Sequence, residues 1–469
     1  MKILKGILNC LAIFIFIICP HSGLAREKGE IKEKEVVKLP EMVVIESQPG
    51  VEITPDKTII RMDEFKKPGE VRTLTDVLTE IGGIDVQRIN PLMASPGDEV
   101  SIRGLNEGRM VIEIDGRRIN HTGHVGRYIV DWSTLNIDDI ERIEIIRGGH
   151  SVLHPFAIGG VINIITKKGK KTKELKPDIS VKGGYSKYHT YSSAVSITGG
   201  LYNLIGYHFS ASKGETDGYL RNNYQDTYNL NGHFTLFLPS GATFNIGVKY
   251  SDVEYGFPVI NDPSRPDYDP DDPVFIPEAD QLRHLPPTGQ LPENNPHWEK
   301  HTTYLDGIFN MPLGPGNIKL HGFWTEGRRW ISMWRGNTFI KDQFVDDRTK
   351  GMICEYQDIK FDFLSRHSLT LGIEYQELGW PDKNPIIYLV KSAYLQDIIR
   401  LGQWTLTPGV RYYKIDMDTY YSQFGAGWPI SGKKEDDSGL YPSLKVNFQA
   451  TPTTALYAAV SRSYRLPCP

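Results

Sequence analysis

The sequence contains few cysteines, little net charge and only one long hydrophobic run. It has 469 residues, with 4 Cys and a formal net charge of −4. So small a charge gives no reason to expect a nucleic-acid partner, and the lack of a later long apolar run argues against membrane-spanning helices beyond the N-terminal segment. No Walker-type or Rossmann glycine-rich loop is present, and no paired-carboxylate or Ser/His/Asp constellation suggests catalysis. We therefore do not expect an enzyme, and no cofactor is certain.

The N-terminus has the features of a secretory signal peptide. Two lysines precede an apolar run from Ile7 to Cys19, and Gly23-Leu24-Ala25 supplies small residues at the cleavage positions. We expect residues 1–25 to be removed. A membrane anchor is the alternative, but the run is short for a spanning helix. After cleavage only Cys354 and Cys468 remain, which is too few for a metal site.

Residues 51–175 predict a small mixed α/β domain. The segment from Thr73 to Ile81 places several apolar residues on one helical face. Short apolar runs indicate buried strands, and they lie at Val100–Ile102, Met110–Ile114, Ile143–Ile146 and Val161–Ile165.

Residues 176–469 alternate with a period of two. In 244–250, 369–375 and 444–448, apolar residues take every second position, and polar residues such as Lys and Glu lie between them. A barrel with lipid outside and water inside requires this pattern. A soluble secreted β-protein would show the same alternation, but charges on the polar face and aromatic residues at the ends of the runs favour a transmembrane antiparallel β-barrel.

Four motifs of the α/β region resemble the plug domain of TonB-dependent outer-membrane receptors, in the same order. They lie at 73–86, 101–104, 114–116 and 140–167, and similar segments continue into the barrel at 393–397, 406–412 and 461–465. The segment Leu153-His154-Pro155-Phe156 departs from the family, which usually has a Tyr-Gly turn there. No contact is therefore carried over for that turn.

The resemblance implies a receptor in the outer membrane of a Gram-negative bacterium, surrounded by lipid, that imports a scarce metal chelate. A ferric siderophore is the favoured ligand, with cobalamin or haem as alternatives. A sensor with an extra N-terminal domain would need more residues than lie between Ala25 and Met42. We count about thirteen strand-like segments after Ile179, against 22 in plugged outer-membrane transporters. We therefore expect a C-terminally truncated chain with an incomplete barrel.

The resemblance also implies TonB as a partner. Residues 26–50 predict a disordered leader, because the first part is dense in Lys and Glu. Within it lies a run that resembles the TonB box: Met42, Val43, Val44, Ile45 and Glu46. We expect nothing nearby to pair with this run, so it can add to a partner's sheet edge through main-chain hydrogen bonds. The alternative is that it is only the first strand of the plug.

Candidate ligand contacts come from two groups of residues. Aromatic and basic residues are interleaved in one segment and suit an anionic, aromatic chelate: Trp324, Arg328, Arg329, Trp330, Trp334 and Arg335. The alternative is an interfacial aromatic belt with ordinary lumen arginines. His121 and His124 could face the ligand from the plug or bind a metal, although such a loop pair is more often simply solvated.

Two further groups of charged residues are predicted to have specific roles. The Pro-rich stretch from Phe257 to Pro296 predicts an external loop, and its carboxylates could bind calcium: Asp267, Asp269, Asp271 and Asp272. The alternative is a solvated acidic loop. Charged residues near the ends of plug strands are expected to pair with polar lumen residues of the barrel: Arg103, Glu141, Arg142, Glu144 and Arg147.

Overall fold

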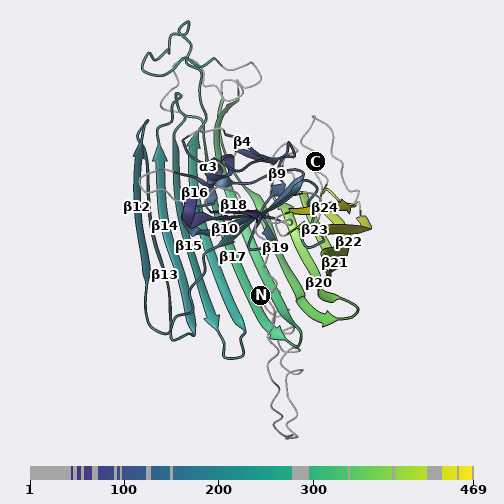
Figure 1. Cartoon of the computed structure of the whole chain (residues 1–469). Coiled ribbons are helices and arrows are strands. Elements are labelled where there is room, and N and C mark those ends of the chain that lie inside the picture. Colours follow the sequence, from purple (N-terminus) through teal and green to yellow (C-terminus); the bar gives the residue numbers. More distant parts are fainter. Residues whose placement is uncertain are drawn as a thin grey trace. The chain divides into compact units, whose positions relative to one another are not determined.

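The structure, a computed structural model, describes residues 44–45, 50–53, 57–65, 72–88, 92–95, 98–122, 128–147, 152–276, 295–335, 338–382, 386–419, 436–451 and 454–466. These residues form an N-terminal α/β domain, called the plug below, and a sheet of long antiparallel strands (Figure 1). The plug and the sheet belong to one compact unit.

The plug is built on a mixed sheet with the strand order β1-β2-β3-β10-β11-β6-β7. The pair β11 and β6 is parallel, and the other neighbours are antiparallel. Two further pairs, β4 with β5 and β8 with β9, stand apart from it. The plug strands are β1 (Val44–Ile45), β2 (Val51–Ile53), β3 (Thr58–Arg61), β4 (Ile84–Gln87), β5 (Glu99–Ile102), β6 (Met110–Ile114), β7 (Arg117–Arg118), β8 (His121–Thr122), β9 (Tyr128–Ile129), β10 (Ile140–Arg147) and β11 (Gly160–Thr166).

The helices of the plug are short. They are α2 (Met62–Phe65), α3 (Leu74–Thr79), η2 (Trp132–Thr134) and η3 (Ile137–Asp139). The helix predicted at 73–81 is confirmed as α3. Thr73 and Asp76 form a reciprocal capping box at its N-terminus, which satisfies backbone N–H groups that the helix leaves without partners. Leu74 and Leu78 are fully buried in the plug core, because residues four apart share one helical face.

In the part of the chain that the structure describes, the large sheet has thirteen strands that pair in chain order, each antiparallel to the next; Figure 1 shows this arrangement. This confirms the expected number of strands. They are β12 (Asp178–Ser186), β13 (Thr190–Leu201), β14 (Ile205–Thr216), β15 (Gln225–Phe237), β16 (Thr243–Gly256), β17 (His297–Leu313), β18 (Gly316–Arg335), β19 (Thr338–Asp362), β20 (Arg366–Trp380), β21 (Ile386–Leu401), β22 (Trp404–Thr419), β23 (Asp436–Thr451) and β24 (Thr454–Ser461). Within the described ranges, no helix is long and apolar enough to cross a membrane.

The two faces of the large sheet differ as the alternation predicts. On β16, Ile246 is 44% exposed and the neighbouring Asn245 is 5% exposed, and on β20 Ile373 is 60% exposed while Glu374 is 5% exposed. Successive side chains of a strand point to opposite faces. The apolar side chains therefore line one face, and the polar side chains line the other face, against which the plug packs.

Connections of two kinds alternate along the large sheet. At one end of the strands, called the short-turn end, neighbouring strands are joined by residues 202–204, 238–242, 314–315, 363–365, 402–403 and 452–453. At the other end, called the long-loop end, they are joined by residues 187–189, 217–224, 257–296, 336–337, 381–385 and 420–435. Outer-membrane barrels place short turns in the periplasm and longer loops outside the cell, so the two ends indicate which way the strands face across the membrane.

Candidate functional site

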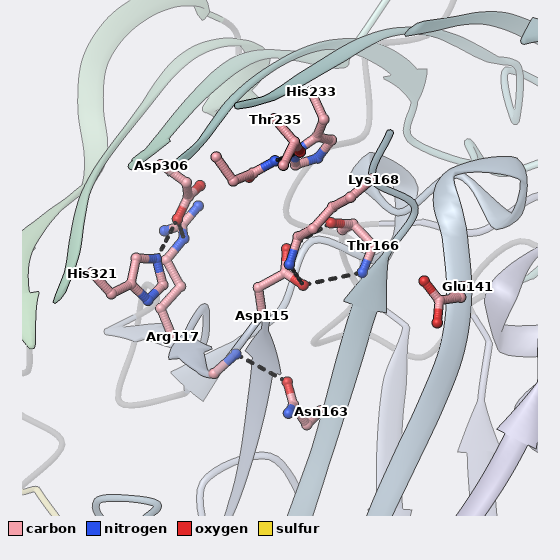
Figure 2. A network of polar contacts seen from close by, with 12 residues as sticks. Asp115, Arg117, Glu141, Asn163, Thr166, Lys168, His233, Thr235, Asp306 and His321 are labelled. Carbon is pink, nitrogen blue, oxygen red and sulfur yellow. Dashed lines mark hydrogen bonds and ion pairs between the residues drawn. The ribbon is translucent and has the colours of Figure 1, made fainter. Parts of the chain in front are cut away.

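A tight turn in the plug positions Arg117, a cation whose side chain is almost completely buried. Asp115 and Gly116 join β6 to β7 and both have positive φ, 52° and 86°. An Asp-Gly pair suits such a hairpin turn, because Gly adopts positive φ without strain and Asp tolerates it. The turn directs the next residue, Arg117, toward the wall of the large sheet (Figure 2).

Arg117 joins the plug to two neighbouring strands of the sheet. Its Nε lies 2.7 Å from Asp306 Oδ1 on β17, and its Nη1 donates to Thr325 Oγ1 on β18 at 2.7 Å. Its guanidinium also lies 5.0 Å from the ring centroid of Tyr304. His321 Nε2 lies 3.0 Å from the same oxygen, Asp306 Oδ1 (Figure 2). The Arg117 side chain is 1% exposed, so this ion pair is almost fully desolvated.

Asp115 stabilises the turn from inside the plug. Its carboxylate accepts hydrogen bonds from the backbone N–H and the hydroxyl of Thr166 at 3.2 and 2.6 Å, and from Lys168 at 3.1 Å (Figure 2). Burial opposes ionisation of this carboxyl, but Lys168 and Thr166 outweigh it and lower the pKa of Asp115. The turn that carries Arg117 is therefore fixed by a charged group.

The segment of η2 and η3 forms a second set of polar contacts to the sheet. Asp139 accepts hydrogen bonds from Ser210 and lies 3.3 Å from His208 Nε2, both on β14. Burial would raise the pKa of Asp139, but these hydrogen bonds outweigh it and lower the pKa. Asp131 lies 3.8 Å from the ammonium of Lys300 on β17. The plug thus contacts several strands through charged pairs.

The segment that departs from the family motif makes an apolar contact with the sheet. The Phe156 ring stacks on Tyr413 of β22 with centroids 5.0 Å apart, and the Phe156 backbone N–H donates to the Tyr413 hydroxyl at 3.3 Å. Arg118 covers the Phe156 ring, with its guanidinium 5.4 Å from the centroid. The unusual turn at 153–156 therefore creates its own contact to β22.

A polar cavity of about 370 Å³ lies between the plug and the sheet. Its plug wall includes Asp115, His154 and Lys168, and its sheet wall includes Glu355 and Arg411. A cavity of this size with many polar partners can hold several water molecules. The boundary between the plug and the sheet therefore contains charged pairs and a cavity that can hold water, as well as packed side chains.

His154 and Glu113 form the charged pair beside this cavity. His154 Nδ1 lies 2.8 Å from Glu113 Oε2, and Glu113 is buried in β6. Burial alone would lower the pKa of His154, but the neighbouring Glu113 outweighs burial and raises it. The pair gives the unusual turn at 153–156 a second anchor to the plug sheet.

A basic and aromatic cluster lies on the plug face of the sheet, near the long-loop end of the strands. This rim cluster comprises Tyr255, Trp298, Arg329, Phe344 and Trp380. Arg329 stacks over Trp298 with 3.6 Å between guanidinium carbon and ring centroid, and Phe344 stacks on Trp380 at 5.1 Å. Tyr255 meets Trp298 edge-on at 5.0 Å. Arg329 lies directly opposite Lys300, which contacts the plug, so the two residues share a face.

The structure does not bring the predicted basic-aromatic segment together on one face. Phe323 and Thr325 both contact Arg117, so Trp324 between them points to the opposite face. By the same alternation Arg328 and Trp330 lie on that opposite face, whereas Arg329 lies on the plug face. Trp334, near the end of β18, is buried and contacts the ring of Phe339. Arg335 ends β18. Of the predicted basic and aromatic residues whose side chains the structure describes, only Arg329 belongs to the rim cluster.

The sequence analysis missed the remaining members of the rim cluster, although period two could have found them. Counting alternate positions from Lys300 places Trp298 on the plug face, and counting along β18 separates Arg329 from Arg328. Arg117 was also missed, although it directly follows the Asp115-Gly116 motif. The prediction grouped residues that are neighbours in the sequence, and it did not consider that neighbouring residues of a strand lie on opposite faces.

Three of the five charged plug residues that were expected to pair with the barrel pair within the plug instead. Arg142 pairs with Glu141 at 2.8 Å and with Glu144 at 2.9 Å, and Glu144 also pairs with Lys57 at 2.8 Å. All four residues belong to the plug, so the expected pairing of Glu141, Arg142 and Glu144 with the barrel is wrong. The pairing predicted for Arg103 and Arg147 stays a prediction. Figure 2 shows Glu141 away from the contacts between plug and sheet. Neighbouring plug strands satisfy these charges because β10 lies inside the plug sheet.

The described aspartates of the 257–296 connection are held mainly by their own loop. Asn261 donates to the backbone carbonyls of Asp269 and Asp272 at 2.8 and 2.9 Å. A hydrogen bond from Arg265 lowers the pKa of Asp267. Among the residues that the structure describes, these aspartates do not gather their donor atoms as a metal-binding group. Calcium binding here stays a prediction.

The other predicted site residues lie at the edges of the described ranges. Val44 and Ile45 form β1 and pair with Ile53 and Glu52 of β2, so the expectation that this run has nothing to pair with is wrong for these two residues. Met42, Val43 and Glu46 lie outside the described residues. His121 pairs through its backbone with Ile129, and His124 lies outside the described residues. The roles predicted for these residues stay predictions.

Comparison with known proteins gives two family matches. Residues 51–161 match the TonB-dependent receptor plug domain, and residues 177–467 match the TonB-dependent receptor-like β-barrel. A vitamin B12 transporter, BtuB of Vibrio vulnificus, is 28% identical over 161 residues, which cover 34% of this chain and 25% of that protein.

Solved structures of similar fold include two siderophore receptors. One is the ferric enterobactin receptor of Pseudomonas aeruginosa, with 18% identity and a TM-score of 0.65 over 90% of this chain and 63% of that chain. The other is the siderophore receptor PirA from Acinetobacter baumannii, with 16% identity and a TM-score of 0.66 over 88% of this chain and 62% of that chain. The chain thus spans less than two thirds of the length of these relatives. Since the two family models together cover most of its sequence, the chain belongs to the TonB-dependent receptors, a family of transporters and receptors rather than enzymes.

Proposed function

We propose that the protein is an outer-membrane receptor of a Gram-negative bacterium that binds a ferric siderophore and imports it with energy delivered through TonB. The observation that carries this proposal is the plug itself, which is joined to the sheet through Arg117, Asp131 and Asp139. A domain held partly by such polar contacts can block a lumen and still be displaced. An apolar cluster around Phe156 also joins the plug to β20, β21 and β22.

The chemistry of these contacts supports a gate. Water can replace a lost hydrogen bond or ion pair once a site opens, whereas exposed apolar surface gains nothing comparable from water. The cavity of about 370 Å³ beside Asp115 and Arg411 provides space from which water can enter. Phe156 on Tyr413 is an apolar contact that resists displacement.

The N-terminal edge of the plug supports a pulling mechanism. Among the described residues, β1 lies at the end of the plug sheet and its two residues pair with β2 alone. Two residue pairs hold few hydrogen bonds, so this strand can be released at small cost. Its backbone can then add to the sheet edge of a partner. TonB would use the run from Met42 to Glu46 in this way.

The rim cluster supports an anionic and aromatic ligand. Arg329 provides a positive charge, and the surrounding rings provide surfaces for stacking. A ferric chelate with aromatic iron ligands combines negative charge with such rings. The cluster is buried, so binding there requires the side chains that cover it to move.

Cobalamin is the second candidate, because the V. vulnificus relative is a vitamin B12 transporter. Cobalamin offers no comparable excess of negative charge for Arg329. The two ligands therefore differ in the effect expected from removing this one guanidinium.

A binding titration tests the ligand class. Tryptophan fluorescence of the purified receptor in detergent should be quenched by a ferric catecholate chelate. Arg329→Gln should weaken this binding on the order of tenfold to a hundredfold, the range of a lost charged contact. Arg328→Gln is the matched control, because the neighbouring side chain lies on the opposite face, and it should bind as the parent does. Quenching by cyanocobalamin but not by iron chelates would overturn the siderophore assignment.

A further inference from the structure

Three potential metal ligands meet on the outer face of the large sheet, away from the plug. Asp252 on β16 lies directly opposite His301 on β17, and Glu299 lies two residues before His301 on the same face. Below them on β16, Ile246 and Val248 are exposed apolar residues, followed by Tyr250. This order of apolar band, aromatic girdle and polar rim is that of an outer-membrane barrel at its water interface.

The donor atoms of these three residues are spaced for one small cation. His301 Nε2 lies 2.9 Å from Glu299 Oε1 and 3.3 Å from Asp252 Oδ1, and all three donor atoms lie within 4.8 Å of one another. Ligands at about 2.1 Å from a tetrahedral zinc ion are separated by roughly 3.4 Å. Small side-chain rotations would therefore be enough to seat an ion.

The three ligands also have rigid support. The His301 ring contacts Trp330 of β18, with centroids 4.5 Å apart, and Tyr250 of β16 at 6.1 Å. The two strands that carry the ligands, β16 and β17, pair with each other from Thr243 to Gly256 of β16. Because sites built on strands hold their geometry better than sites built on loops, the cluster is preorganised.

A row of carboxylates beside the cluster favours a bound cation, and Arg328, which lies directly opposite His301, is paired with Glu326 at 3.0 Å. In-register pairing places Glu215 opposite Asp226, Asp226 opposite Glu254, and Glu254 opposite Glu299. Like charges directly opposite one another on a sheet are destabilising. Lys213 lies 2.7 Å from Glu215 and 4.0 Å from Asp226, at one end of this row. A divalent ion at the other end would relieve the remaining repulsion.

We propose that Asp252, Glu299 and His301 bind a divalent transition-metal ion such as zinc. One imidazole and two carboxylates match the ligand preference of zinc better than that of magnesium or calcium, which favour all-oxygen sites. With three protein ligands, a fourth position stays open to water or to another oxygen ligand. The ion would cross-link β16 and β17 at the base of the 257–296 connection, independently of the imported ligand.

Zinc titration of the folded protein, produced without a histidine tag and held in a phosphate-free detergent, tests this proposal. Calorimetry should show saturable binding of one zinc ion, unaffected by an excess of magnesium. Cobalt(II) as a substitute should give the visible absorption of a low-symmetry nitrogen and oxygen site. His301→Gln and Asp252→Asn should each weaken binding by roughly tenfold or more.

A matched control separates this site from any exposed histidine. His367 lies 2.6 Å from Asp397 but belongs to no group of three ligands among the described residues, so His367→Gln should bind zinc as the parent does. Heat-modifiable migration on gels confirms that each variant is folded. An absence of saturable binding in the folded parent, or unchanged binding in folded His301→Gln, would overturn the proposal.

Discussion

Replacing Arg117 with Met tests how the plug is held. The substitution keeps an unbranched side chain of similar length but removes the guanidinium that contacts Asp306 and Thr325. Asp306 then keeps only His321 as its partner among the contacts described above. The Asp306 side chain is 14% exposed, so its charge stays largely buried.

The expected cost follows from the burial of this pair. Removing one partner of a buried ion pair destabilises a protein by about 3 to 5 kcal/mol. We expect the lower end, about 3 kcal/mol, because His321 still contacts the carboxylate and some solvent reaches it. A loss of this size lowers the equilibrium constant for closing the plug on the order of 100-fold.

Hydrogen exchange measures this loss where it occurs. Protection of the backbone amides of β6 and β11 should fall on the order of 100-fold in Arg117→Met. Protection of β14 and β15 should change little. Arg109→Met is the control, because Arg109 is an exposed plug residue whose side chain hydrogen-bonds to the nearby Asn106 of the plug. Equal protection in Arg117→Met and the control would refute the reasoning that the buried ion pair holds the plug.

Three other predictions follow from particular residues. Val44→Pro should abolish uptake in cells, because proline removes a backbone donor, whereas Val44→Ala should be mild; normal uptake with the proline variant would contradict the assignment of the TonB contact. Burial raises the pKa of Glu107 from its ordinary value of 4.5 to about 8, so the stability that its neutral form contributes is complete below pH 4.5 and is lost as pH rises toward 8. The parent should therefore lose about 2 kcal/mol more than Glu107→Gln between pH 6 and 8 in chemical denaturation, and parallel curves would show that the carboxyl is already ionised at pH 6. Calorimetry should detect calcium binding that disappears when Asp269, Asp271 and Asp272 become Asn, and an absence of heat in the parent would end that idea.

Local sequence patterns predicted the elements of the fold well. Apolar residues on one helical face between Thr73 and Ile81 indicate α3, and alternation over 244–250 and 369–375 gives both the strands and their outward faces. These signals depend on residues that are close together in the chain. Local chemistry therefore determines them, and no knowledge of the tertiary fold is needed.

Contacts between distant segments were predicted less well. Arg117 and Asp306 are far apart in the sequence, and nothing in either neighbourhood indicates that they meet. Val44 was expected to be unpaired, because a two-residue strand gives almost no periodic signal. The family motif could not supply the contact of Phe156 with Tyr413, because this sequence departs from the motif at that turn.

Iron uptake in cells tests the central claim most directly. A strain without its own siderophore receptors, producing a receptor that carries this sequence, should accumulate radioactive iron from a ferric catecholate chelate. Accumulation should require TonB, should fall strongly with Arg329→Gln and should be unchanged with Arg328→Gln. Uptake that is equal in strains with and without TonB, or that is insensitive to Arg329→Gln for every iron chelate transported, would contradict the account.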